Sequence, residues 1–265
     1  MTVYEQDGYG IRLEWGPDGV RALAPHCAVV IIIDVLVFTT SVDVALGRGG
    51  RVMPLPWRDE AADERARKAG AVLTRSGLRR TTEGFDADPQ GTPWTLRPSS
   101  LTELPAGTLL AVASPNGATL CVRAAESGAT VLTGCLRNAT AVAHAARTIA
   151  GDRPIGIVPA GERWHDTESR GLRPSLEEYL GAGAIANALD GPAASPEVQL
   201  AAMAFRAAKD RLAELLTGCV SGLELAHAGV PTDVELAGDL DVSEVVPILV
   251  DGVFEPLSAG STSAR

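Results

Sequence analysis

The sequence predicts an α/β fold in which parallel strands alternate with helices in α/β/α layers. The segment Val29–Val35 is a continuous apolar run that begins with five β-branched residues, which is typical of a strand buried on both faces of a parallel sheet. Strand-like and helix-like segments then alternate along most of the chain. Aromatic residues make up only 4% of the 265 residues, whereas small aliphatic residues and glycine abound. This composition suits helices packed closely on a sheet.

Strands and helices alternate most clearly at the start of the first half of the chain. We expect strands at Val29–Val35 and Arg51–Leu55, and helices at Thr39–Gly47 and Asp59–Lys68. The sequence GRGG at 47–50 precedes a strand instead of opening a helix, so we interpret it as a helix end and a turn, not as a phosphate loop. The segment Leu73–Ser100 is polar and too long for an ordinary connection, and we expect it to cover the functional site.

The second half repeats the alternation. We expect strands at Thr108–Ala113, Thr130–Gly134 and Ile155–Val158, helices at Ala141–Ala150, from Pro174 onward and at Ser195–Thr217, and a final strand region at Asp239–Phe254. The chain exceeds the commonest size of a single domain. One domain spanning residues 1–265 and two subdomains split near residue 105 are therefore both open.

Charge and composition exclude several classes of protein. A net charge of −10 argues against nucleic-acid binding, which requires a basic face. The longest apolar run is far shorter than the roughly 20 residues that span a bilayer, so we expect no membrane segment. The four cysteines are scattered without a C-x-x-C pair, which favours reduced thiols and a cytoplasmic protein. The histidines lack the spacing of zinc ligands, and His165 alone is a candidate site residue.

One acid follows the first strand at the point where that strand leaves the core. Ligands of open α/β sheets bind outside the carboxyl ends of the strands, so Asp34 could hold a metal or attack an electrophile there. The alternative is that Asp34 caps the helix that follows.

A second group of acids occurs downstream. Glu162 and Arg163 follow a predicted strand at the position equivalent to Asp34, and Glu177 lies at the start of a predicted helix. Glu178 is either a site residue or the partner of Ser175 in a capping box of the form S-x-x-E. Because Mg²⁺ prefers hard oxygen ligands, these acids predict a divalent-cation site.

Small polar residues follow two other strands. Ser114, Asn116 and Gly117 would let the backbone approach an anion at a helix N-terminus, although an ordinary turn with Asn116 or Ser114 as N-cap is the alternative. Arg137 and Asn138 could reach the same ligand, and exposed or capping roles are the alternative for both.

Several motifs occur in an order that carries a family resemblance. They are IIIDVLVFTTSVDVAL, GFDAD, SPNGATL, GCLRNATAVA, VPAGERW and RPSLEEYLGAGAI. Together they resemble the 2-phosphosulfolactate phosphatase (ComB-like) family over nearly the whole chain. The resemblance implies a ComB-like α/β fold and Mg²⁺-dependent hydrolysis of a phosphomonoester of a small 2-hydroxy acid that carries another anionic group. Asp34 and Glu177 match the family's acids, and Ser114, Asn116 and Gly117 match its small polar turn.

The sequence departs from the family pattern at two places. The family has an arginine three residues after the first Asp, where this chain has Val37, and the residues after Asp86 differ from the usual Gly-Asn-Ser-Pro. Arginine is suited to bidentate capture of phosphate or sulfonate. Either Arg163 or Arg137 replaces it, or the ligand lacks one anionic group, or catalysis has been lost.

We therefore expect Asp34 and Glu177 to be the catalytic acids. With Glu162 and Asp86 they would bind Mg²⁺, and the substrate residues would be Ser114, Asn116, Gly117, Arg137, Asn138 and Arg163. An aspartyl-phosphate on Asp34 is the mechanistic alternative to direct attack by water. The alternative function is a catalytically degenerate small-acid-binding or scaffold protein. We also expect the protein to bind a small phosphorylated acid and to form a homodimer.

Overall fold

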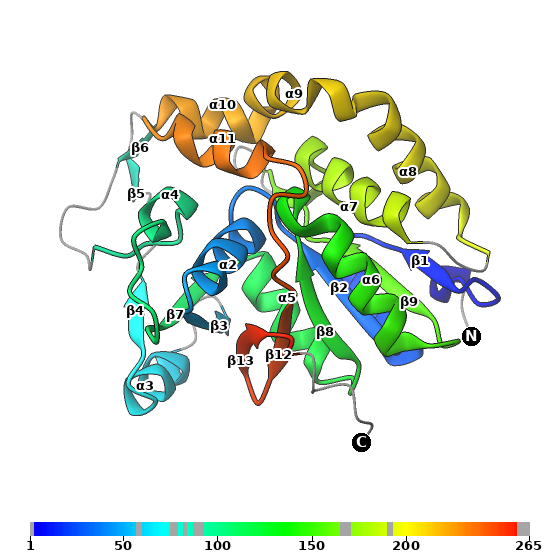
Figure 1. Ribbon diagram of the computed structural model, residues 1–265, viewed down its shortest axis with the longest axis horizontal. Helices are drawn as coiled ribbons and strands as arrows, with labels where there is room; N and C mark the ends of the chain where they lie inside the picture. Colours follow the sequence, from blue (N-terminus) through cyan, green and yellow to red (C-terminus); the bar gives the residue numbers. More distant parts are fainter. Residues whose placement is uncertain are drawn as a thin grey trace.

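The computed structural model describes residues 3–56, 60–74, 79–81, 84–86, 93–164, 171–189 and 193–258. Its main feature is a nine-stranded sheet with the order β1-β9-β2-β8-β12-β13-β3-β7-β4, flanked by helices, which confirms the predicted α/β fold (Figure 1). The strands of this sheet are β1 Ile11–Leu13, β2 Val29–Ile33, β3 Arg51–Pro56, β4 Val72–Thr74, β7 Leu109–Ser114, β8 Thr130–Gly134, β9 Ile155–Pro159, β12 Pro247–Val250 and β13 Val253–Pro256. Two short antiparallel pairs lie outside it, β5 Arg79–Thr81 with β6 Gly84–Asp86 and β10 Glu162–Arg163 with β11 Leu172–Arg173.

The helices lie on both faces of the sheet and above its carboxyl edge. They are α1 Gly16–Leu23, α2 Phe38–Gly47, α3 Glu60–Lys68, α4 Pro98–Leu101, α5 Gly117–Ala125, α6 Ala139–Ala150, α7 Leu176–Ala188, α8 Pro196–Ala208, α9 Leu212–Gly218, α10 Val220–His227 and α11 Pro231–Gly238. Short 3₁₀ turns add η1 Val3–Glu5, η2 Ala24–His26, η3 Leu136–Asn138 and η4 Lys209–Arg211. Helices α8 to α11 form an arch over the other elements in Figure 1.

An antiparallel hairpin separates two parallel parts of the sheet. Strands β1, β9, β2 and β8 run parallel to one another, as do β3, β7 and β4, and β12 and β13 join the two parts in antiparallel pairing. The final strand region is thus two strands. Their turn is Asp251-Gly252, both with positive φ, and Asp-Gly is a favoured pair for tight hairpin turns. Strands from both sides of residue 105 share this sheet, and a division into subdomains stays a prediction.

Strand β2 separates the two main hydrophobic clusters. Val29, Ile31 and Ile33 pack into a cluster with residues of α6, α7 and α8, whereas Val30 and Ile32 pack into a cluster with residues of α2 and α5. Successive side chains of a strand point to opposite faces, so a continuous apolar run fits a strand covered on both sides. This is the burial that the sequence predicted for Val29–Ile33.

Helix α7 is buried between the sheet and α8, and glycines permit its close packing. A Cβ on Gly183 would lie 2.3 Å from the carbonyl oxygen of Ala201 in α8, and one on Gly181 would lie 2.7 Å from Cγ2 of Val35. These contacts bring the first turn of α7 close to the end of β2. That turn carries Glu177 and Glu178.

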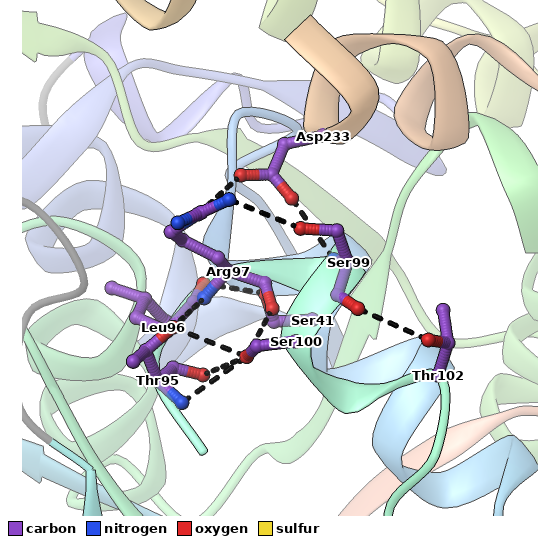
Figure 2. A network of polar contacts seen from close by, with 8 residues as sticks. All are labelled: Ser41, Thr95, Leu96, Arg97, Ser99, Ser100, Thr102 and Asp233. Atoms are coloured by element: carbon purple, nitrogen blue, oxygen red, sulfur yellow. Dashed lines mark hydrogen bonds and ion pairs between the residues drawn. The ribbon is translucent and has the colours of Figure 1, made fainter. Parts of the chain in front are cut away.

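A polar network attaches α4 to α11 and α2 (Figure 2). Nε of Arg97 donates to Oδ2 of the fully buried Asp233 at 2.9 Å, and the backbone N–H of Ser99 donates to its Oδ1 at 2.9 Å. Ser41 Oγ of α2 donates to the carbonyl oxygen of Leu96 at 2.7 Å. We predicted the segment Leu73–Ser100 as one long loop. That prediction is wrong in part, because the segment contains the short strands β5 and β6 and the start of α4. Residues 75–78, 82–83 and 87–92 lie outside the described residues, and cover over the site stays a prediction.

The predicted long helix Ser195–Thr217 is interrupted. Residues Lys209–Arg211 form η4 and are exposed, and α9 then starts with the buried Leu212 and packs against α11. The three polar residues break the apolar stripe, so the chain can change direction there without loss of burial. None of the helices in the described part is both long and apolar enough to cross a membrane.

Candidate active site

Asp34 lies directly after β2 and binds the N-termini of two helices. Its Oδ1 accepts the N–H of Phe38 at 3.2 Å, and its Oδ2 accepts the N–H of Gly117 at 2.8 Å. These residues are the first of α2 and α5, so the carboxylate lies where helix dipoles favour negative charge. Asp34 thus accepts an N–H group at the start of each of two helices, although Val37 and not Asp34 occupies the N-cap position of α2. Asp34 is 3% exposed, which makes it a fixed anion at the edge of the sheet.

The turn after β7 is built around close approach to Asp34. A Cβ on Gly117 would lie 2.7 Å from Oδ2 of Asp34 and 2.4 Å from Cδ1 of Phe38, so a side chain there would displace α5. Asn116 precedes α5, but its side chain makes no capping bond. Its Nδ2 instead donates to Oε2 of Glu162 at 3.1 Å. Asn116 is therefore the N-cap residue of α5, as the alternative predicted, but its side chain binds Glu162 and not the helix.

Glu178 does not form the capping box that the sequence offered. The Ser175 side chain makes no capping bond, and Oε2 of Glu178 accepts the N–H of Gly161 in the turn between β9 and β10. Glu178 thus joins the start of α7 to the end of β9. Its other oxygen, Oε1, is buried and has no hydrogen-bond partner among the residues that the structure describes.

Glu177 is equally buried and has one weak partner. Sγ of Cys219 lies 3.5 Å from its Oε2, and burial, with the nearby Glu177 adding to it, raises the pKa of that thiol to about 12, so the thiol keeps its proton. Within the described part of the chain, Oε1 of Glu177 has no hydrogen-bond partner. Buried polar atoms nearly always have one, because leaving them unpaired costs free energy. A ligand would satisfy the free oxygens of Glu177 and Glu178.

The acids form one electrostatic group. Burial raises the pKa of Asp34 to about 6, against the bonds from Gly117 and Phe38 and with a contribution from Glu177. Burial raises the pKa of Glu162 to about 8, and the charges of Asp34 and Glu177 add to it. The pKa of Glu178 is well above its usual range from burial and the same neighbours. A cation among these acids would favour their charged forms.

The donor set suits Mg²⁺ better than a metal that needs a complete protein cage. Within the residues that the structure describes, no three His, Cys, Asp or Glu side chains are placed to hold a metal ion. Mg²⁺ usually takes one or two carboxylates and fills its remaining positions with water and substrate phosphate. The free oxygen of Glu177 and the nearby Asp34 fit that pattern. The side chains of Asp86 and His165, also candidates, lie outside the described residues.

Arg137 and Asn138 have protein partners. Nε of Arg137 donates to Oδ2 of Asp43 at 2.9 Å, and its Nη1 donates to the carbonyl oxygen of Leu236 at 2.9 Å. The fully buried Asn138 accepts the N–H of Cys135 at 2.9 Å and donates to the carbonyl oxygen of Val245 at 3.0 Å. These contacts connect η3 to α2, to α11 and to the chain that follows α11. The structure gives no support for substrate contact by either residue.

Arg163 lies in a cleft beside the acids. The cleft has a volume of about 260 Å³ and is lined by Pro17, Pro115, Asn116, Thr119, Leu120, Arg123, Ala160 and Arg163. Sequence reasoning missed Arg123. The spacing of Asn116, Thr119, Leu120 and Arg123 is that of one helix face, which is the signal that could have found it.

Comparison with known proteins assigns the family. A family model described as 2-phosphosulpholactate phosphatase matches residues 18–252. The chain belongs to the 2-phosphosulfolactate phosphatase family. Two curated relatives are named probable 2-phosphosulfolactate phosphatases. The protein of Deinococcus radiodurans is 30% identical over 236 residues, which cover 87% of this chain and 91% of the relative. The protein of Thermotoga petrophila is 25% identical over 230 residues, covering 86% and 92%.

Membership confirms the resemblance seen in the ordered motifs. By name, this is a family of phosphoric monoester hydrolases. At 25–30% identity the chain is a divergent member, consistent with Val37 at the position of the family arginine.

Proposed function

We propose that this chain is a Mg²⁺-dependent phosphatase that hydrolyses a phosphomonoester of a small anionic 2-hydroxy acid of the 2-phosphosulfolactate type. The names of the relatives support the reaction and the substrate class. The observation that carries the proposal is the pair of unpartnered, buried oxygens on Glu177 and Glu178, next to Asp34 and Glu162. Such a group of acids is costly for a folded protein unless a cation compensates it.

Asp34 and Glu177 would hold the cation, and the nearby Glu162 would add its negative charge to the site. When bound, Mg²⁺ would neutralise phosphate charge and favour attack by water. Phosphoryl transfer depends mainly on positioning and on compensation of charge. The N–H groups of Phe38 and Gly117 fix the Asp34 carboxylate, and Gly161 fixes that of Glu178.

Asn116 and the turn around it would bind the transferring group. Nδ2 of Asn116 points to the acids through its bond to Glu162, and the turn leads into the N-terminus of α5. Donors in this position can stabilise the non-bridging oxygens of a phosphoryl group in a site that excludes water. Ser114 supports the turn, because its Oγ accepts the N–H of Asn116 at 3.3 Å.

The second candidate is a catalytically degenerate protein that binds a small acid. The observation that favours it is Val37, which is half-buried and packs against the same hydrophobic cluster as α7, where the family has an arginine. A guanidinium at that position would add charge-assisted hydrogen bonds that valine cannot supply.

Release of inorganic phosphate separates the two candidates. We would assay 2-phosphosulfolactate, other phosphorylated 2-hydroxy acids and simple phosphate esters, each with Mg²⁺ and with EDTA. The proposal expects hydrolysis of phosphate esters that carry at least one further anionic group, and this hydrolysis should stop with EDTA and return with added Mg²⁺. Turnover that persists in EDTA would contradict the cation requirement. A folded protein that binds these esters but releases no phosphate would establish the degenerate binding protein.

A further inference from the structure

Two arginines line the cleft beside the acids, and neither side chain has a hydrogen-bond or ion-pair partner in the part of the chain that the structure describes. Arg123 extends from α5 and Arg163 from β10. Among the described residues, neither guanidinium makes an ion pair or a hydrogen bond. Other arginines next to functional or buried groups are paired, as Arg97 is with Asp233 and Arg137 with Asp43. The chain has a net charge of −10, so a cleft that contains two guanidinium groups without bound acids is locally positive in a negatively charged protein.

The cleft is continuous with the proposed active site through one residue. Asn116 forms part of the cleft wall, and its Nδ2 donates to Oε2 of Glu162 at 3.1 Å. Glu162 and Arg163 are neighbours in β10, and adjacent side chains of a strand point to opposite sides. The strand therefore directs an acid to one side and a base to the other. A small ligand at Asn116 would meet the acids at one end and the arginines at the other.

We propose that Arg123 and Arg163 form a subsite for the second, non-reacting anionic group of the substrate, a carboxylate or a sulfonate. This inference rests on the proposed function and adds to it the residues that select a substrate with an anionic group besides its phosphate. The guanidinium fork matches the two oxygens of a carboxylate or sulfonate and forms charge-assisted bonds. The phosphoryl group then lies at the acids, and the second anion lies in the cleft.

The subsite also explains how the chain manages without the family arginine. At that position Val37 packs into apolar surroundings, so this position supplies no charge. Of the two replacements open from the sequence, Arg137 is already bonded to Asp43 and Leu236. Arg163 has no such partner among the described residues, and Arg123 lines the same cleft. The anion-binding role has moved from the loop after β2 to the cleft between α5 and β10.

The test compares two substrates that differ in the second anion. 2-Phosphoglycolate carries a phosphate and a carboxylate, whereas ethyl phosphate carries a phosphate alone. Arg123→Gln and Arg163→Gln are each expected to raise KM for 2-phosphoglycolate about tenfold more than KM for ethyl phosphate, since one charge-assisted bond is lost. The matched control is Arg153→Gln, because Arg153 is exposed and its side chain makes no hydrogen bond or ion pair among the described residues; this variant should leave both KM values unchanged.

A binding measurement keeps the subsite testable even if the proposed reaction fails. Calorimetric titration with sulfoacetate, which carries a sulfonate and a carboxylate but no phosphate, should show at least tenfold weaker binding to either variant than to the wild type. Equal KM changes for both esters, or unchanged sulfoacetate affinity in both variants, would overturn the subsite. Sulfoacetate binding that depends on the arginines in a protein that hydrolyses no ester would retain the subsite and reject the phosphatase.

Discussion

Two sets of buried acids differ in what surrounds them. Asp43 and Asp233 are each bonded to an arginine, Arg137 and Arg97, at 2.9 Å. Asp34, Glu177 and Glu178 have no salt bridge to a basic side chain among the described residues, and two of their oxygens have no partner at all. Removing one member of a buried ion pair lowers the free energy of unfolding, because the remaining charge is buried without a partner. A buried acid that has no basic partner already destabilises the fold in this way. The paired acids therefore belong to the scaffold, and the unpaired ones indicate a site that a ligand completes.

The largest expected effect is on activity at the unpaired set. Glu177→Gln keeps the shape of the side chain and removes its charge, so phosphate release should fall by about 10²–10³-fold, as on loss of one electrostatic contact in other enzymes. The free energy of unfolding should stay the same or rise, because a buried charge without a cation partner is removed. Steady-state kinetics and urea denaturation measure the two quantities. Loss of stability together with full activity of the folded fraction would place Glu177 in the scaffold.

The paired set should respond in the opposite way. Arg97→Gln leaves the fully buried Asp233 without its cation, and we expect a loss of about 3 kcal/mol in the free energy of unfolding, at the lower end for such pairs because Arg97 is partly exposed. KM and kcat of the folded fraction should change little. Urea denaturation with a parallel kinetic assay provides the measurement. Unchanged stability would show that this salt bridge does not hold α4 to α11.

The effect of pH on stability is a smaller test of the same contrast. Folding raises the pKa of Asp34 from 3.8 to about 6 and that of Glu162 from 4.5 to about 8. The folded state then binds more protons than the unfolded state between these values, so stability without a cation should fall as pH rises from about 4 to 8. Mg²⁺ should raise the melting temperature more at pH 8 than at pH 5.5, where protons compete with it. Equal Mg²⁺ effects at both pH values would show that these acids do not bind the cation.

The smallest of these effects is expected at Glu178. Glu178→Gln can still accept the N–H of Gly161 through its amide oxygen, so the free energy of unfolding should change by less than about 1 kcal/mol. Glu178→Ala removes this acceptor and should cost more, about 1–3 kcal/mol, if the buried N–H of Gly161 is left unpaired. Denaturation of both variants measures the difference. Equal losses in the two variants would mean that the charge of Glu178, and not its bond to Gly161, stabilises the fold.

The sequence predicted what depends on neighbours in the chain. Five β-branched residues predicted the burial of Val29–Ile33 on both faces. The position of Asp34 directly after that strand predicted that its carboxylate lies at the edge of the sheet. Local sequence motifs gave a wrong prediction where a residue far away in the sequence forms the hydrogen bond instead. The Ser175 and Glu178 pattern permits a capping box, but Gly161 provides the Glu178 carboxylate with a donor that the pattern cannot show. The pair Asp251-Gly252 is a local signal for the hairpin of β12 and β13, which we had predicted only as one final strand region.

The division of polar residues into scaffold and site was beyond the sequence. Arg137 and Arg163 both follow strands and have the same chemistry, but Asp43 of α2 lies beside the first and a cleft beside the second. That difference depends on which helices pack together, a property of the whole fold. The sequence places Arg123 on the same face of α5 as Asn116, but only the packed fold shows that this face lines a cleft together with Arg163.

The central claim is that the unpaired acids bind a divalent cation. Calorimetric titration of Mg²⁺ into the wild type, Glu177→Gln and Glu214→Gln tests it most directly, because Glu214 is an exposed acid bonded to Arg211 far from these residues in the sequence. The account predicts one cation per chain with proton release in the wild type and in Glu214→Gln, and binding about 10- to 100-fold weaker in Glu177→Gln. Equal Mg²⁺ affinity in all three proteins, or no binding to the wild type with or without substrate, would contradict it.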